Sequence, residues 1–144
     1  MRAIRGTAVS SFRSPAPTMP GHSRKSHYLL IVDDDAAVRE VLATLLVEEG
    51  HRCATAADAT TALAMVGGEP FELVLSDLKM PGRDGLWLLE QMKAVAPGVP
   101  VVILTGHGGR EREDELLERG AAGFLLKPPN VPELLELIER LLAR

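Results

Sequence analysis

The sequence predicts an α/β domain built on a doubly wound parallel sheet of five strands. From residue 28 to the end of the chain, short apolar runs alternate five times with stretches of helical periodicity. The apolar runs are hydrophobic throughout rather than at every second position, which is typical of strands buried on both faces. Alternation of this kind predicts helices on both sides of the sheet, and right-handed crossovers bring the carboxyl ends of all strands to one edge.

The predicted strands are short apolar runs bounded by polar or turn residues. Val, Ile and Leu dominate the first, third and fourth runs, whereas the second is weak. The third run ends shortly before Met80-Pro81-Gly82, and a Pro-Gly pair marks a turn. The five predicted strands are residues 28–32, 52–55, 71–77, 100–105 and 122–126.

Helical periodicity follows each of the first three strands. After the first, apolar residues recur at i, i+3, i+4, i+7 and i+8, which places them on one helix face, and Gly50 ends the helix. Asp58 and Asp84 stand at the starts of the next two helices, where an N-cap accepts main-chain N–H groups. The predicted inward faces are Val38, Val41, Leu42, Leu45 and Leu46, then Ala59, Ala62, Leu63 and Val66, then Leu88, Met92 and Val95.

The last two helices differ in composition. Residues 108–119 are strongly charged, begin with two glycines and offer only Leu116 and Leu117 to the core, so this helix is predicted to be weakly anchored. The final helix, 131–143, opens with a run that resembles a capping box with Asn130 as the cap. Its predicted inward face is Leu134, Leu135, Ile138, Leu141 and Leu142.

Composition narrows the class of protein. The chain has 144 residues, 46% hydrophobic and only 3% aromatic, so we expect one domain with an aliphatic core. No apolar run approaches the roughly 20 residues of a membrane span, and we expect a cytoplasmic protein. The single Cys53 excludes an internal disulfide framework and predicts a small packed side chain. Three histidines, His22, His27 and His51, are expected to be solvent-exposed and without function.

The charge is unevenly distributed. Residues 1–26 contain five basic residues, several serines and three prolines but no acid, and we expect a disordered basic tail. A transit peptide fits less well than a solvated tail or initiation at Met19, because the prolines would interrupt an amphipathic helix. Residues 27–144, the predicted domain, carry the remaining 11 basic residues and all 20 acidic ones, a net charge of −9. That acidic body argues against direct nucleic-acid binding.

Polar side chains follow four of the predicted strands. Asp33, Asp34 and Asp35 come after the first, Asp77 ends the third, Thr105 ends the fourth and Lys127 follows the fifth. Carboxylates that converge at one sheet edge repel one another unless a cation is present, and Mg²⁺ prefers oxygen ligands. A lysine and a hydroxyl nearby would contact the oxygens of a phosphoryl group. The set predicts phosphoryl chemistry on a carboxylate nucleophile.

These residues resemble the receiver domain of response regulators in two-component signalling. The signature consists of Asp33-Asp34, Asp77 with Met80-Pro81-Gly82 and Asp84-Gly85, Thr105, and Lys127-Pro128, in this order over residues 28–144. The resemblance implies a flavodoxin-like (βα)5 fold with strand order 2-1-3-4-5. It also implies a signalling switch that assists its own phosphorylation and dephosphorylation, rather than an enzyme.

The resemblance assigns the phosphoryl and metal roles. Asp77 would accept a phosphoryl group from a phosphohistidine on a sensor histidine kinase or a phosphotransfer protein. Asp34 would bind Mg²⁺ directly, Asp33 directly or through water, and Asp77 and the main-chain carbonyl of Lys79 would complete the protein ligands. Asp35 is instead predicted to cap the first helix, because it immediately precedes it.

The remaining roles concern the switch. Thr105 would hydrogen-bond the phosphoryl oxygens and Lys127 would pair with them, with a cis bond between Lys127 and Pro128. Phe124 matches the aromatic switch position of the family but lacks a tyrosine hydroxyl, and Pro129 stands where many receivers have Phe. A downstream effector, or a second copy of the chain, would dock on the face made by helix 108–119, strand 122–126 and the last helix.

Two other functions fit parts of the pattern. A receiver-like binding module that switches without phosphate usually lacks one of the acids, the threonine or the lysine, and all are present here. A phosphatase of the haloacid dehalogenase type would use Asp33-x-Asp35 with a Thr and a Lys. It would need a further acidic pair after the lysine, whereas the acids that follow lie on an amphipathic helix, and it leaves Asp77 without a role.

Overall fold

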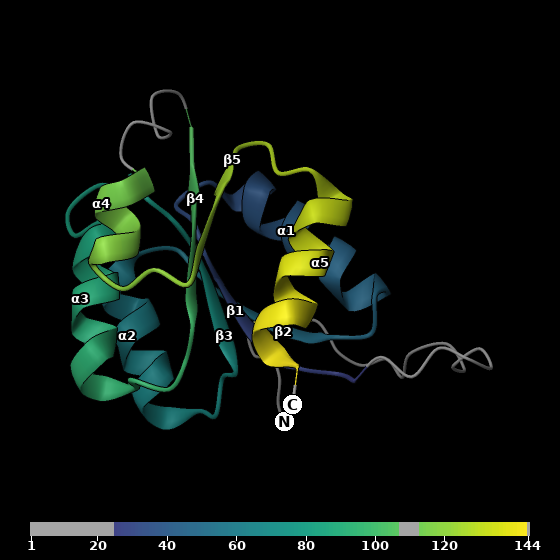
Figure 1. Ribbon diagram of the computed structural model, residues 1–144, viewed down its shortest axis with the longest axis horizontal. Coiled ribbons are helices and arrows are strands. Elements are labelled where there is room, and N and C mark those ends of the chain that lie inside the picture. Colours follow the sequence, from purple (N-terminus) through teal and green to yellow (C-terminus); the bar gives the residue numbers. More distant parts are fainter. Residues whose placement is uncertain (1–24, 107–112, 144) are drawn as a thin grey trace.

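A computed structural model describes residues 25–106 and 113–143. It contains a five-stranded parallel sheet in the order β2-β1-β3-β4-β5, with helices between the strands (Figure 1). The predicted fold class and strand order are confirmed. The elements are β1 Tyr28–Val32, α1 Ala36–Glu48, β2 Arg52–Ala56, α2 Ala59–Gly68, β3 Leu73–Asp77, α3 Gly85–Val95, β4 Val101–Thr105, α4 Glu113–Glu118, β5 Gly123–Leu126 and α5 Val131–Leu142.

Two apolar layers enclose the sheet, with α2, α3 and α4 on one side and α1 and α5 on the other (Figure 1). Strand β1 supplies both layers, because successive side chains of a strand point to opposite faces. Leu30 packs with residues of α2 and α3, whereas Leu29 and Ile31 pack with residues of α1 and α5. Full burial on both faces explains the continuous apolar runs in the sequence.

The predicted helix caps are confirmed. Asp35, Asp58, Asp84 and Asn130 each accept a hydrogen bond from a main-chain N–H in the first turn of their helix, at 2.7–3.0 Å. Such a cap stabilises a helix by about 1 kcal/mol relative to alanine. Asp35, Asp58 and Asp84 therefore start α1, α2 and α3 at fixed positions relative to the strand ends.

The predicted core was wrong at three positions. Val41, Val95 and Leu117 are exposed by 58%, 47% and 43%. Adjacent helix residues point about 100° apart, so Leu117 cannot face the sheet where Leu116 does, and Val95 is the last residue of its helix. Leu89 and Leu137 are buried instead. The predicted start of the fourth helix at Gly108 lies outside the described residues, as do residues 1–24 of the predicted tail.

For two of the three histidines, the predicted solvent exposure was wrong. His27 and His51 are buried at the amino ends of β1 and β2, which are neighbours in the sheet. Their rings stack with centroids 5.7 Å apart, the His27 N–H donates to Nδ1 of His51, and Nδ1 of His27 lies 3.0 Å from Glu72 Oε2. These contacts give hydrogen-bond partners to the Nδ1 atoms of both buried rings. His22 is outside the described residues.

Cys53 packs against the layer of α1 and α5, as predicted, and burial raises the pKa of its thiol to about 12. In the part of the chain that the structure describes, the helices are too short or too polar to span a bilayer.

Candidate functional site

The sheet brings the predicted site residues to one edge. Strands β1 and β3 are in register, with Val32 beside Ser76, so Asp33 and Asp77 follow at the same level. On the other side of β3, Asp77 lies beside Leu104, one residue before Thr105. Lys127 follows β5 and donates its main-chain N–H to the carbonyl of Thr105 at 2.8 Å. Four strands therefore place two acids, a hydroxyl and an ammonium group together.

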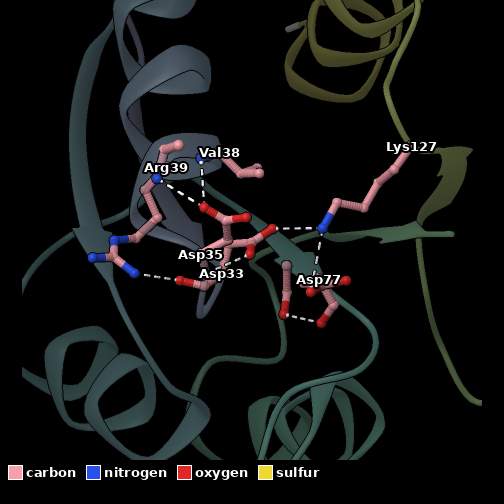
Figure 2. Close-up of polar contacts among 8 residues, drawn as sticks. Asp33, Asp35, Val38, Arg39, Asp77 and Lys127 are labelled. Atoms are coloured by element: carbon pink, nitrogen blue, oxygen red, sulfur yellow. Dashed lines mark hydrogen bonds and ion pairs between the residues drawn. The ribbon is translucent and has the colours of Figure 1, made fainter.

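Asp33 is fully buried and takes part in four hydrogen bonds, and those with Lys127 and Arg39 can be followed in Figure 2. Its N–H donates to the carbonyl of Ala56 at 3.1 Å. Its carboxylate accepts from the N–H of Asp35 at 2.9 Å and from Nζ of Lys127 at 2.9 Å. Its main-chain carbonyl accepts from the guanidinium group of Arg39 at 2.7 Å. Asp33 therefore has a single, well-defined orientation.

Asp77 is the last residue of β3 and is 7% exposed. Burial and the nearby charge of Asp33 raise the pKa of its carboxyl above the usual value, and Lys127, 3.3 Å away, partly offsets this shift. Asp77 is thus an acid at a sheet edge with its charge only partly compensated, and an additional cation would stabilise the ionised form.

Lys127 links the two acids, since its Nζ reaches between Asp33 and Asp77 (Figure 2). Burial opposes its charge, but the hydrogen bond to Asp33 and the attraction of Asp77 raise the pKa of the ammonium group. The peptide bond between Lys127 and Pro128 is cis, as predicted.

An acidic cluster beside Lys127 fits a hard cation. Asp33, Asp34 and Asp77 each offer a carboxylate oxygen, and these oxygens lie within 4.8 Å of one another. Oxygen donors at this spacing suit Mg²⁺, which is usually held by one or two carboxylates and keeps several waters. Asp34 is exposed, so water and a phosphate oxygen have access to the cluster. Asp35 caps α1 through Ala37 and Val38 instead, as predicted.

The other predicted residues lie around this cluster. Thr105 is 3% exposed at the end of β4, and Phe124 is half-buried against the layer of α2 and α3. Lys79 is exposed in the loop after β3, where Gly82 adopts a φ of 77°, a conformation that favours glycine.

Two residues were missed as parts of the site. Arg39 was not predicted, although a basic residue one turn into α1 is the signal that could have indicated it. Gly85 appeared in the signature without a role. A Cβ there would lie 2.4 Å from the carbonyl oxygen of Asp77, so only glycine permits this approach of α3 to the strand end.

Replacing Asp77 by Asn should raise the melting temperature of the metal-free protein at neutral pH. Since the pKa of Asp77 is raised in the fold, the ionised carboxylate destabilises the native state. That destabilisation is fully present above the raised pKa, shrinks as the pH falls towards 3.8, and is absent below it. Melting curves of both proteins across this range measure the difference.

Asp58→Asn is the matched control, because the pKa of Asp58 is lowered by hydrogen bonds from Thr61. It should not stabilise the protein. A pH-independent gain for Asp77→Asn would mean that relief of charge is not the cause.

The comparisons with known proteins agree with this geometry. The family model described as "Response regulator receiver domain" matches residues 29–139. The chain belongs to this receiver domain family. Receiver domains are the phosphoacceptor switches of two-component systems, and the alternative of a haloacid-dehalogenase-type phosphatase is not favoured.

Curated relatives of this receiver domain are regulators of greater length. The chain is 39% identical over 112 residues to the response regulator protein FleR of Pseudomonas aeruginosa, covering 78% of this chain and 24% of FleR. It is 37% identical over 110 residues to the DNA-binding transcriptional regulator NtrC of Salmonella typhimurium, covering 76% of this chain and 24% of NtrC. The chain thus spans about a quarter of the length of these relatives.

Solved structures show the same fold. The receiver domain of NtrX from Brucella abortus superposes with a TM-score of 0.75 at 39% identity, covering 79% of this chain and 97% of that domain. A longer NtrX structure from the same organism, in complex with ADP, gives a TM-score of 0.77 at 38% identity, covering 82% of this chain and 27% of that one.

Proposed function

We propose that this receiver domain accepts a phosphoryl group on Asp77 from a phosphohistidine of a sensor histidine kinase or phosphotransfer protein. One observation carries the assignment. Among the described residues, Asp77 is the carboxylate that lies in the acidic cluster, ends a central strand and contacts Lys127. Each oxygen of the Asp33 carboxylate already accepts a hydrogen bond, from Asp35 and from Lys127, and Asp35 caps α1, which favours Asp77 as the acceptor.

The transfer forms a bond between an Asp77 oxygen and phosphorus and breaks the phosphorus–nitrogen bond of the donor imidazole, which keeps the electron pair. Asp33, Asp34, Asp77 and the carbonyl of Lys79 would hold Mg²⁺, which supplies positive charge against the phosphoryl oxygens. Lys127 provides a second positive charge, and Thr105 a hydroxyl donor. Because these groups are already positioned at the strand ends, the protein would assist its own phosphorylation and dephosphorylation.

The same geometry supports an output surface. Thr105 precedes the segment that leads to α4, and β5 links Phe124 to Lys127, three residues on. We propose that Thr105 moves towards the phosphoryl group, that Phe124 repacks, and that the face of α4, β5 and α5 changes. A downstream effector or a second copy would bind there, and the whole exchange would take place in the cytoplasm.

The test of the phosphoacceptor is intact-mass spectrometry after incubation with Mg²⁺ and acetyl phosphate. We expect one acid-labile phosphoryl group on the wild type and none on Asp77→Asn. Asp58→Asn controls for the loss of one carboxylate and should be labelled normally. Equal labelling of Asp77→Asn would overturn the assignment and revive Asp33 as nucleophile, and an unlabelled wild type would favour a binding module that switches without phosphate.

The output face is tested by amide hydrogen exchange with and without beryllofluoride, a phosphoryl mimic. Hydrogen-exchange protection should change most in β4, α4 and β5. Helix α4 is short, and among its described residues Leu116 alone is buried, so the helix is weakly anchored to the sheet. Such a shift requires a few kcal/mol of differential binding, which is within the range of a charged contact. Changes confined to the loops after β1 and β3 would rule out this face.

A further inference from the structure

We infer that Arg39 is a positioning residue for the Mg²⁺ ligands, acting through the main chain of Asp33. The inference rests on the proposed function, since it concerns the same metal site. Arg39 lies in the first turns of α1, and its guanidinium group donates to the main-chain carbonyl of Asp33 at 2.7 Å (Figure 2). Its side chain is half-buried, so water competes only weakly for this bond.

The bond matters because of the peptide unit that it holds. The carbonyl of Asp33 belongs to the planar peptide that joins Asp33 to Asp34, so fixing its direction also fixes the start of Asp34. Asp33 has other contacts to orient it, through Ala56, Asp35 and Lys127. Asp34 is exposed, and within residues 25–106 and 113–143 its carboxylate has no hydrogen-bond partner. Its aim at the cluster therefore depends on the main chain that Arg39 holds.

The charge of Arg39 should weaken Mg²⁺ binding, whereas its positioning of Asp34 should strengthen it. A positively charged guanidinium group in contact with the main chain of Asp33 would also repel a Mg²⁺ ion bound beside it. If Arg39 acts mainly through its charge, removing it should tighten Mg²⁺ binding. If it acts mainly through position, removing it should weaken binding. The sign of the change in affinity decides between the two.

The experiment compares Arg39→Met, Arg39→Lys and the control Arg140→Met, which removes the same charge from an exposed position in α5. Titration of metal-free protein with MgCl₂, followed by calorimetry and by ¹H–¹⁵N NMR, gives the dissociation constant. We expect Arg39→Met to bind about tenfold more weakly, the lower end of the range for partners that orient metal ligands. Arg39→Lys should recover part of the loss, and Arg140→Met should match the wild type.

A second readout separates positioning from general stability. In metal-free Arg39→Met, the amide resonances of Asp34 and Asp35 should shift, while those at the far end of the sheet, such as Arg52, should not. Unchanged or tighter Mg²⁺ binding by Arg39→Met would overturn the inference, as would a loss of affinity that only follows a lower melting temperature. A wild type that binds Mg²⁺ but is not labelled by acetyl phosphate would overturn the proposed function and leave the role of Arg39 standing.

Discussion

Replacing Lys127 by Met should destabilise the metal-free protein by about 1–3 kcal/mol. Asp33 is fully buried, and Lys127 is its cationic partner at 2.9 Å. Without that partner, Asp33 keeps one hydrogen bond from Asp35 to its carboxylate while its charge is left uncompensated. Removing one member of a buried ion pair costs about 3–5 kcal/mol of stability. We expect a smaller loss here because the side chain of Lys127 is 24% exposed.

Mg²⁺ should restore much of the stability lost in Lys127→Met. A cation between the acids replaces the missing charge, and the variant no longer places an ammonium group that competes for the same oxygens. Its affinity for Mg²⁺ should therefore exceed that of the wild type, and ligand binding stabilises the native state by RT ln(1 + [L]/Kd). Phosphorylation of Asp77 should still be slow, because Lys127 is lost as a phosphoryl partner.

Thermal melts in EDTA and in MgCl₂ measure this effect, with Lys93→Met as the control for an exposed lysine on α3. The expected result is a gap between Lys127→Met and wild type that narrows as Mg²⁺ is added. A gap of constant size would mean that the methylene chain of Lys127 matters through packing rather than charge.

The sequence was sufficient to predict the fold and which of the predicted polar residues would lie together at the strand ends. In a parallel sheet, the residue that ends each strand is placed by topology alone, so Asp33, Asp77, Thr105 and Lys127 had to meet once five strands were recognised. Local rules also placed the caps at Asp58 and Asp84, because an N-cap needs only its own helix.

What was missed depends on contacts between elements. The burial of His27 and His51 follows from the pairing of β1 with β2, which brings two isolated histidines together. The contact of Arg39 with Asp33 depends on a side-chain conformation that no spacing specifies. Val41 is exposed because only part of the apolar face of α1 packs against the sheet. The sequence pattern identifies the apolar face but not the part of it that is in contact.

Replacing Gly85 by Ala should destabilise the protein by about 2–3 kcal/mol and slow phosphorylation of Asp77. A Cβ at this position would lie 2.4 Å from the carbonyl oxygen of Asp77 and 3.0 Å from Cα of Leu78. Both are main-chain atoms, which cannot move aside as a flexible side chain would. The N–H of Gly85 also donates to the carbonyl of Leu78 at 2.9 Å, so the start of α3 is tied to the segment that it would clash with.

Two responses are open to the alanine variant, and both carry a cost. If α3 moves away, Leu88 and Leu89 lose part of their packing in the core. If the end of β3 moves instead, the carboxylate of Asp77 shifts relative to Lys127 and Asp34, and a displacement of about 1 Å is enough to slow a reaction a hundredfold. Chemical denaturation measures the loss of stability, and the rate of labelling by acetyl phosphate measures the slowing of phosphorylation.

Gly67→Ala is the matched control, since a Cβ there meets nothing within 4 Å and the residue lies in α2. Because alanine favours the helix, Gly67→Ala should stabilise the protein by roughly 0.5–1 kcal/mol and leave labelling unchanged. The same substitution thus has opposite signs at two positions, and the difference isolates the contact of α3 with the strand end. A Gly85→Ala protein as stable and as rapidly labelled as the wild type would show that this approach is loose enough to admit a methyl group, and Gly85 would then have no part in placing Asp77.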